Sequence, residues 1–191
     1  MFKPIHLLSS FNCITTQHLW LGYSGGLDSH VLLHALVELI NTKQLNIALP
    51  QLHAIHINHG WSSNAAIWDQ HCQQVCRDLN VDYQSLTINA KATNGESPEA
   101  YAREARYAAL ANFINENDIL LTAHQQDDQA ETLLVQLLRG SGVKGLASMP
   151  RLSRFAKGWH LRPLLDFARD DLLAYAKQQR NFWKTLEETI S

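Results

Sequence analysis

A short run of small and polar residues, Ser24-Gly25-Gly26-Leu27-Asp28-Ser29, lies between two apolar segments. Its glycines have no Cβ, so the backbone can turn tightly and approach an anion, and a helix that starts here would add unpaired N–H groups. Ser24 and Ser29 can add hydroxyl donors. A carboxylate repels phosphate unless a cation lies between them, so Asp28 indicates Mg²⁺ bridging to a pyrophosphate group. The alternative is a plain strand–turn–helix with an N-cap.

A second group of polar residues, His124, Asp127, Asp128 and Glu131, follows another apolar segment. Asp128 and Glu131 share a helical face, and Asp127 is also adjacent to Glu131, so these carboxylates could hold an ammonium group or a metal. The alternative is a solvated, acidic first turn stabilised by the helix dipole. His124 could donate to a phosphate or hydrogen-bond a nucleobase, or it could cap the helix.

Two arginines, Arg103 and Arg106, lie on one face of a predicted helix. Their planar guanidinium groups suit a phosphate or a developing negative charge. The alternative is ion pairing with Glu99 or Glu104. His53, His56 and His59 recur every three residues, which prevents them from sharing one face of a strand, so we predict no metal site there.

The segment 139–162 contains six basic residues and no Asp or Glu, in a chain whose net charge is −2. The net charge gives no general attraction to nucleic acid. The local excess predicts a surface that faces phosphates, with an ordinary solvated loop as the alternative. The basic residues are Arg139, Lys144, Arg151, Arg154, Lys157 and Arg162.

Strands and helices alternate along the chain. Strands are predicted at 18–23, 51–58, 81–88, 118–123 and 160–165, and helices at 27–40, 61–79, 97–115, 127–139 and 166–178. This order predicts an α/β fold: a Rossmann-like parallel sheet of about five strands with helices on both faces. Ligands bind at the carboxyl ends of such strands, which is where the loops after Tyr23 and Ala123 lie.

The composition is that of a soluble globular protein. The chain has 191 residues, 46% apolar and 18% charged, enough for one domain. Its longest apolar run is far short of a membrane span, and its first residues do not form a signal peptide. The three cysteines, Cys13, Cys72 and Cys76, lack the spacing of a disulfide framework or zinc finger. We therefore expect reduced thiols in a cytoplasmic protein.

Several motifs carry a resemblance to a known family. The run 24–29 resembles the PP-loop of the ATP pyrophosphatase superfamily, whose fold is adenine nucleotide alpha hydrolase-like. Further along are Ile57-Asn58-His59-Gly60, the helix 99–107 and the stretch 122–132, followed by Arg139-Gly140-Ser141-Gly142, Gly145-Leu146 and Arg162-Pro163-Leu164-Leu165. In this order, over residues 17–178, they resemble the catalytic domain of tRNA(Ile)-lysidine synthetase.

The resemblance implies a carbon–nitrogen ligase that uses ATP and Mg²⁺. ATP would adenylylate the C2 carbonyl oxygen of the first anticodon cytidine in isoleucine tRNA with a CAU anticodon, releasing pyrophosphate. The amine of L-lysine would then attack that carbon and release AMP. The expected partners are therefore tRNA, lysine and ATP, with a second copy of the chain as a further candidate. No association with a membrane is expected.

The resemblance also implies roles for individual residues. Catalytic roles fall to Asp28, Arg103, Arg106, Asp128 and Glu131. ATP would be bound by Ser24, Gly25, Gly26, Leu27, Asp28, Ser29 and His124, with Asp28 on Mg²⁺. Lysine would be held by Asp128 and Glu131. The tRNA would be contacted by Arg139, Lys144, Arg151, Arg154 and Lys157.

The chain departs from the family after the catalytic domain, which we assign to residues 1–178. The family continues with an acidic residue before Ser-Asn and a later Arg-Asn, whereas residues 179–191 form an atypical tail with an isolated Arg180-Asn181. The family's C-terminal tRNA-binding domains are absent, as in a fragment, a truncation or a frameshifted product. The alternatives are a thiolase-type PP-loop enzyme, which would carry paired Cys-x-x-Cys motifs, and a nucleotide- or tRNA-binding module without full activity.

Overall fold

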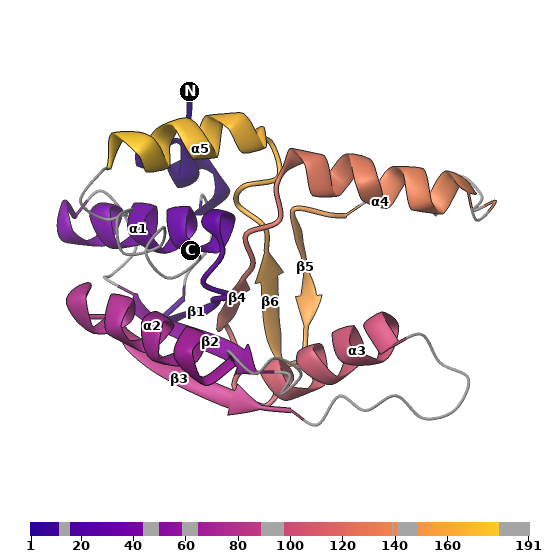
Figure 1. Ribbon diagram of the computed structural model, residues 1–191, viewed down its shortest axis with the longest axis horizontal. Coiled ribbons are helices and arrows are strands. Elements are labelled where there is room, and N and C mark those ends of the chain that lie inside the picture. Colours follow the sequence, from indigo (N-terminus) through magenta and orange to yellow (C-terminus); the bar gives the residue numbers. More distant parts are fainter. Residues whose placement is uncertain are drawn as a thin grey trace.

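A six-stranded sheet, in the order β3-β2-β1-β4-β6-β5, forms the centre of the described part of the chain (Figure 1). The computed structural model describes residues 1–11, 16–43, 50–58, 65–88, 98–138, 140 and 149–179. The strands are β1 (His18–Gly22), β2 (Gln51–Asn58), β3 (Asp82–Thr87), β4 (Ile119–Leu121), β5 (Leu152–Phe155) and β6 (Gly158–Leu161). All neighbours pair in parallel except β5 and β6, which are antiparallel.

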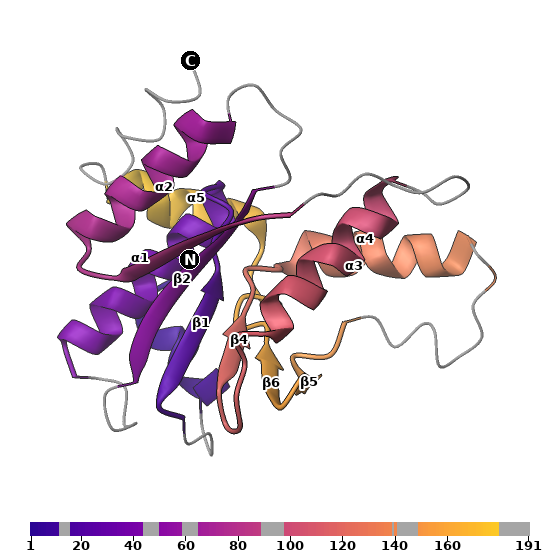
Figure 2. The ribbon, with the colours of Figure 1, turned by 90° about the horizontal axis from the view of Figure 1, so that it is seen from below.

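Helices cover both faces of this sheet, as the alternating pattern predicts. They are a 3-10 helix η1 (Pro4–Phe11) and the α-helices α1 (Leu27–Asn41), α2 (Ala65–Asp78), α3 (Pro98–Ala111), α4 (Gln126–Leu138) and α5 (Arg169–Gln178). Figure 2 shows α1, α2 and α5 on one side of β1 and β2, and α3 on the other. Two hydrophobic cores result, one beneath α1, α2, α5 and η1 and a smaller one beneath α3.

The central strands β1 and β4 are apolar on both faces, as expected for parallel strands covered by helices on each side. Leu19 and Leu21 of β1 face the larger core, and Trp20 between them faces the smaller one. Leu19 is in register with Ile119, and Leu21 with Leu121. The chain runs outward from β1 to β3 and then returns to β4 on the other side of β1, so the topological switch point lies between β1 and β4. Ligands bind at this point in open α/β sheets.

The structure adds two elements that the sequence does not predict, η1 and β5. The strand β5 lies within the basic segment expected to be a loop, and it forms a hairpin with β6 through Ala156, whose φ is 49°. The hairpin packs so close to the residue before β4 that a Cβ at Gly158 would overlap the carbonyl oxygen of Asp118. The sheet therefore has six strands rather than five. The expected helix starts at 61 and 97 lie outside the described residues.

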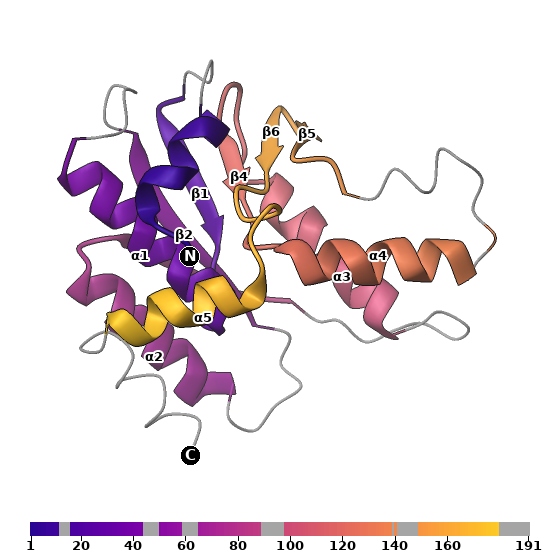
Figure 3. The ribbon, with the colours of Figure 1, turned by 90° about the horizontal axis from the view of Figure 1, so that it is seen from above.

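The helix α4 departs from the usual packing of a crossover helix. None of its residues is buried, and Leu134, Val135, Leu137 and Leu138 are 58%, 45%, 50% and 87% exposed. Figure 3 shows the helix pointing away from the sheet. In the described residues, no helix combines the length and apolar character needed to cross a membrane.

Candidate functional site

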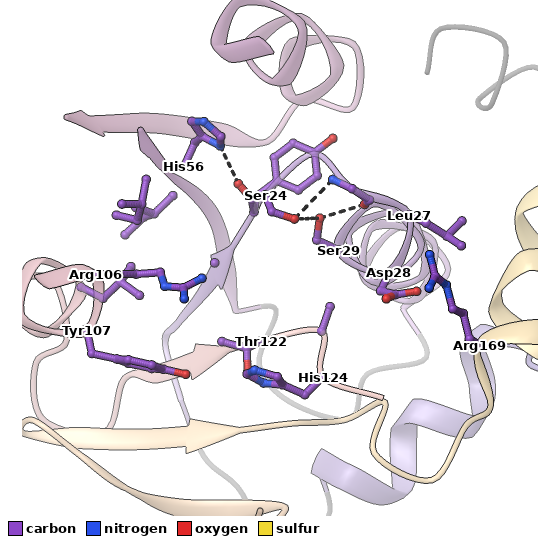
Figure 4. Close-up of a pocket in the computed structure, with 17 residues that line it drawn as sticks. Ser24, Leu27, Asp28, Ser29, His56, Arg106, Tyr107, Thr122, His124 and Arg169 are labelled. Atoms are coloured by element: carbon purple, nitrogen blue, oxygen red, sulfur yellow. Dashed lines mark hydrogen bonds between the residues drawn. The ribbon is translucent and has the colours of Figure 1, made fainter. Parts of the chain in front are cut away.

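A cavity of about 550 Å³ lies at the carboxyl ends of β1, β2 and β4, at the switch point of the sheet. Its wall includes the loop after β1, the start of α1, one side of α3, the residues after β4 and Arg169 at the start of α5 (Figure 4). The two loops that the sequence places at the strand ends therefore meet at one cavity.

The loop 24–29 forms one wall, and its turn requires glycine. Gly25 has a φ of 78°, and a Cβ there would lie 2.7 Å from Cys72 Sγ and 2.8 Å from Trp68 Nε1. Trp68 also donates its indole N–H to the carbonyl oxygen of Ser24 at 2.7 Å. Helix α2 thus holds the loop in its tight turn, as the Gly-Gly pair predicts.

The first turn of α1 presents its backbone N–H groups to the cavity. Gly26 is the N-cap and contributes no side-chain hydrogen bond. The N–H groups at a helix start lack intrahelical partners and lie at the positive end of the dipole, so together they are suited to an anion.

The two serine hydroxyl groups are used within the loop. Ser29 Oγ donates to the carbonyl oxygen of Gly26 at 3.0 Å and lies 3.0 Å from Ser24 Oγ. Ser24 Oγ also accepts the N–H of Gly26 at 3.3 Å. Since Ser29 has committed its hydrogen, Ser24 must donate to Ser29. The backbone N–H groups, rather than the expected hydroxyl groups, are the donors left for a ligand.

The carboxyl group of Asp28 lies between this loop and α5. Its Oδ1 is buried and has no hydrogen-bond partner among the described residues. Burial raises the pKa of Asp28; the Arg169 guanidinium opposes this, and Asp128 and Asp127 add to it. A buried carboxylate oxygen without a partner is costly unless a cation binds it, so Asp28 fits a Mg²⁺ ligand whose other ligands are phosphate oxygens and water. The described residues contain no cluster of three or more protein ligands for a metal.

Arg106, Tyr107, Thr122 and His124 line the opposite wall. Arg106 lines the cavity and Arg103 does not, although their guanidinium groups lie 6.0 and 5.3 Å from the Tyr107 ring. No ion pair with Glu104 forms in the described part of the chain, and the side chain of Glu99 lies outside it. The arginine facing the cavity is therefore available to a ligand.

His124 is held by a hydrogen bond rather than used as a helix cap. Its Nδ1 lies 2.8 Å from Thr122 Oγ1. Burial, with Arg162 next in effect, lowers the pKa of His124 to about 4, so the ring is neutral at pH 7. The caps of α4 come instead from Asp128, which accepts the N–H of Gln125 at 2.8 Å, and from the Gln125 side chain, which accepts the N–H of Asp127 at 2.7 Å.

The expected lysine pair, Asp128 and Glu131, does not line the cavity. Asp128 caps α4 by accepting the N–H of Gln125, and its charge also acts on Asp28. Glu131 is exposed. The structure therefore brings Asp128 close to the loop and leaves Glu131 on the surface of α4.

The basic segment is not a uniform surface. Arg162 is 7% exposed and donates to the carbonyl oxygen of Pro150 at 2.8 Å, so its inclusion in a phosphate-facing surface is wrong. Arg151 pairs with Asp166, and Arg154 lies 3.9 Å from the centroid of the Trp159 ring. Lys157 is exposed. Arg139 and Lys144 lie outside the described residues.

Several polar cavity residues were given no binding role from the sequence, among them His56, Tyr107, Thr122 and Arg169. His56 Nδ1 donates to the carbonyl oxygen of Tyr23 at 2.9 Å. Arg169 carried a signal that could have been used, because a cation in the first turn of a helix is unfavourable with its dipole and needs another reason. Thr122 and Tyr107 carry no comparable local signal.

Comparison with known proteins identifies the family of this chain. The family model described as the PP-loop domain matches residues 4–188. The tRNA(Ile)-lysidine synthase of Coxiella burnetii is 45% identical over 184 residues, covering 96% of this chain and 40% of the relative. That of Pseudomonas syringae pv. tomato is 48% identical over 181 residues, covering 94% and 39%. The chain thus spans well under half the length of these relatives.

The fold is also shared with a solved structure, the U34-tRNA thiolase NcsA from Methanococcus maripaludis. The TM-score is 0.69 with 20% identity, covering 96% of this chain and 63% of that chain. At this identity the likeness concerns the fold alone. With the loop, the switch-point cavity and the family match taken together, the chain belongs to the PP-loop domain family.

Proposed function

We propose that this chain provides the ATP-dependent catalytic part of a tRNA(Ile)-lysidine synthetase. In this reaction ATP adenylylates the C2 carbonyl oxygen of the first anticodon cytidine, and the lysine amine then displaces AMP. The observation that carries the proposal is the 45% and 48% identity to tRNA(Ile)-lysidine synthases over nearly all of this chain. The cavity supports it with a phosphate cradle on one wall and a guanidinium on the other.

The loop wall would bind the pyrophosphate end of ATP. Backbone N–H groups of the α1 start would contact the phosphate oxygens, and Arg169 lies beside Asp28 at the same end (Figure 4). When bound, Mg²⁺ would neutralise charge on the departing pyrophosphate. Asp28 would hold it, and the fixed N–H dipoles would stabilise the charge without rearranging during the reaction.

The side-chain wall would face the reacting atoms. Arg106 extends from α3 into the cavity, where its guanidinium suits the charge that develops at the α-phosphate. Arg103 does not line the cavity. We propose that its guanidinium, which lies over the Tyr107 ring, contributes positive electrostatic potential to the site. Neutral His124 would add a hydrogen-bond donor or acceptor beside Thr122.

Lysine binding requires a carboxylate from outside the cavity lining. The amine must be unprotonated to attack, so a carboxylate that first binds the ammonium group is needed nearby. Asp128 is close enough to act on Asp28, whereas Glu131 is exposed on α4. We propose that Glu131 contacts lysine from the exposed surface of α4 once tRNA and lysine are bound.

Glu131→Gln tests this assignment. The variant should raise the KM for lysine by about 10-fold, the scale of a charged hydrogen bond, and leave ATP binding unchanged. Asp127→Asn is the matched control, because it removes a neighbouring charge on the same turn. Equal losses of lysine use and ATP binding in Glu131→Gln would instead indicate a role in the stability of α4.

The remaining partners follow from the relatives. We propose isoleucine tRNA with a CAU anticodon as the substrate, contacted by the exposed basic residues of 139–162, in a cytoplasmic protein that can form a homodimer. Residues 1–178 would form the catalytic domain. The chain covers 40% of the relative's length, so the proposal concerns the part of the reaction that these residues perform.

A direct experiment measures pyrophosphate release from ATP with each amino acid in turn, with isoleucine tRNA and with an unrelated tRNA. Release stimulated by lysine and isoleucine tRNA together, with the modified cytidine detected by mass spectrometry, is the expected result. Release that depends on a sulfur donor would favour a thiolase. The thiols argue against that outcome, because burial raises the pKa of Cys72 and of Cys76 to about 12 and keeps both protonated.

A further inference from the structure

We propose that Arg162, His160 and Thr122 form a hydrogen-bond relay that fixes His124 as the tautomer with its proton on Nε2, a donor toward an oxygen of the nucleotide. The role of the donor rests on the proposed function; the tautomer does not. Arg162 and His160 lie behind the cavity wall, whereas Thr122 and His124 form part of it. Arg162, His160 and Thr122 are positioning residues, because they act through His124.

The relay begins at Arg162, which sets the direction of every later bond. The side chain is 7% exposed, and Tyr107 and the carbonyl oxygen of Pro150 hold it in place. Its Nη2 lies 3.1 Å from His160 Nδ1. A guanidinium can only donate, so His160 Nδ1 must accept and carries no proton.

His160 passes this constraint across its ring. The residue is 3% exposed, and burial together with Arg162 lowers its pKa to about 3. A neutral imidazole has one proton, which must then be on Nε2. That atom lies 2.8 Å from Thr122 Oγ1, so the ring donates and the hydroxyl oxygen accepts.

Thr122 has a single hydroxyl hydrogen, and its oxygen already accepts from His160. The hydrogen is therefore directed to its other partner, His124 Nδ1, at 2.8 Å. If His124 held its proton on Nδ1, two rings would donate to one oxygen and the hydroxyl hydrogen would have no acceptor. The arrangement with all bonds satisfied leaves His124 with its proton on Nε2.

The consequence concerns which chemistry His124 can perform. Its ring faces the charges of Arg103, Arg106, Arg162 and Asp128. With Nδ1 occupied and Nε2 protonated, the neutral ring has no free lone pair to accept a proton. It serves as a fixed neutral donor, suited to a phosphoryl oxygen, and not as a general base.

The tautomer can be observed in the free protein. Long-range ¹H–¹⁵N NMR of the full chain should show His124 Nδ1 as the unprotonated nitrogen at neutral pH, with the resonance assigned by its loss in His124→Gln. Thr122→Val removes the hydroxyl group at nearly constant volume and should shift His124 toward a mixture of tautomers, whereas Thr122→Ser should preserve it. A proton on Nδ1 of the original chain, or an unchanged tautomer in Thr122→Val, would overturn the relay.

A kinetic comparison tests what the relay does. Losing part of one preorganised donor should lower kcat for pyrophosphate release on the order of 10-fold in Thr122→Val, with the KM for ATP little changed and rescue in Thr122→Ser. Full activity in Thr122→Val would overturn the proposed role. If Thr122→Val does not fold, the spectrum of the original chain still decides the tautomer. No release by the original chain would count against the proposed function and leave the tautomer to the spectrum.

Discussion

The two walls of the cavity both offer hydrogen-bond donors to a ligand, but they are built differently. The loop wall is contiguous in sequence, uses backbone N–H groups, and is shaped by Gly25 against Trp68 and Cys72. The opposite wall is assembled from α3 and the end of β4, and the hydrogen bonds of its side chains lead back through His160 of β6 to buried Arg162. Local backbone geometry can therefore shape a candidate anion site from six consecutive residues, whereas the proposed neutral donor depends on side chains from distant parts of the sequence.

The largest expected effect comes from the one carboxylate on the loop wall. Asp28→Asn should lower pyrophosphate release by about 100-fold or more, the scale of removing a group that stabilises charge in the transition state. The same variant should be more stable than the original chain at neutral pH. Its carboxyl pKa is raised by burial, so the ionised form costs folding free energy that Asn does not.

Activity assays over a Mg²⁺ titration and chemical denaturation measure both effects. Activity and Mg²⁺ dependence that both survive in Asp28→Asn would refute the metal-bridging role. A loss of activity that accompanied a loss of stability would instead point to a damaged fold.

The next effect tests whether the loop wall depends on its turn. Gly25→Ala combines a φ of 78° with contacts of 2.7 and 2.8 Å to Cys72 and Trp68, so the loop must move. Gly140→Ala is the matched control, since it has a φ of 68° with nothing within 4 Å of the added Cβ. Both should lose about 1 kcal/mol from the left-handed backbone. Only Gly25→Ala should also weaken ATP binding, by tens of fold, as measured by calorimetry.

Equal ATP affinities in these two variants would show that the packing of α2 against the loop is unimportant for the phosphate site. A Gly25→Ala chain that bound ATP normally would contradict the cradle itself.

The buried histidines of and behind the opposite wall should make the stability of the protein depend on pH. Burial lowers the pKa of His124 to about 4 and of His160 to about 3, against an unfolded value near 6.5. Between these pKa values the unfolded chain binds more protons than the folded chain. The free energy of unfolding should therefore be highest above about pH 6.5 and should fall as the pH drops toward 4. Each histidine adds a slope of up to about 1.4 kcal/mol per pH unit.

Urea denaturation at several pH values between 7.5 and 4.5 measures this slope, and His160→Gln should flatten it. His30, whose pKa burial lowers to about 3, would keep part of the slope in that variant. A stability that did not change across this range would mean that the histidines are hydrated and that the relay is open to solvent.

The contrast between the walls also explains what the sequence could predict. Residues 24–29 follow one another, so glycines, hydroxyl groups and a carboxylate can be assigned to a phosphate turn before any fold is known. The β2 bounds and the α/β class follow from apolar periodicity in the same way. Thr122 and His160 are 38 residues apart, and they meet only because β6 pairs with β4.

Charge patterns were the weakest guide. Arg162 belongs to an acid-free segment and is nevertheless buried, because a hairpin that the periodicity does not predict folds that segment onto the sheet edge. Asp166 lies just past the segment and pairs with Arg151. Counting charges along the chain misses the burial of Arg162 and the pairing of Arg151, because burial and ion pairs depend on neighbours in space.

The smallest expected effect separates the basic residues of that segment. Arg154 is exposed and held over the Trp159 ring at 3.9 Å, which orders its guanidinium without neutralising it. Arg151 is already paired with Asp166 and donates to Ser10 Oγ at 2.9 Å. If three or four of the six basic residues of the segment contact tRNA phosphates, the logarithm of the binding constant should fall with the logarithm of salt concentration with a slope of roughly −3. Arg154→Ala should reduce the steepness of this slope by about 1 and weaken binding a few-fold for every tRNA alike.

Arg151→Ala should change the slope less, because the charge of Arg151 already pairs with Asp166, and it should lower the stability of the fold instead. Filter binding at two salt concentrations, with isoleucine tRNA and an unrelated tRNA, measures both variants. Tight, selective binding that ignores salt would place tRNA recognition in this domain through base contacts and refute a phosphate-facing role for the segment.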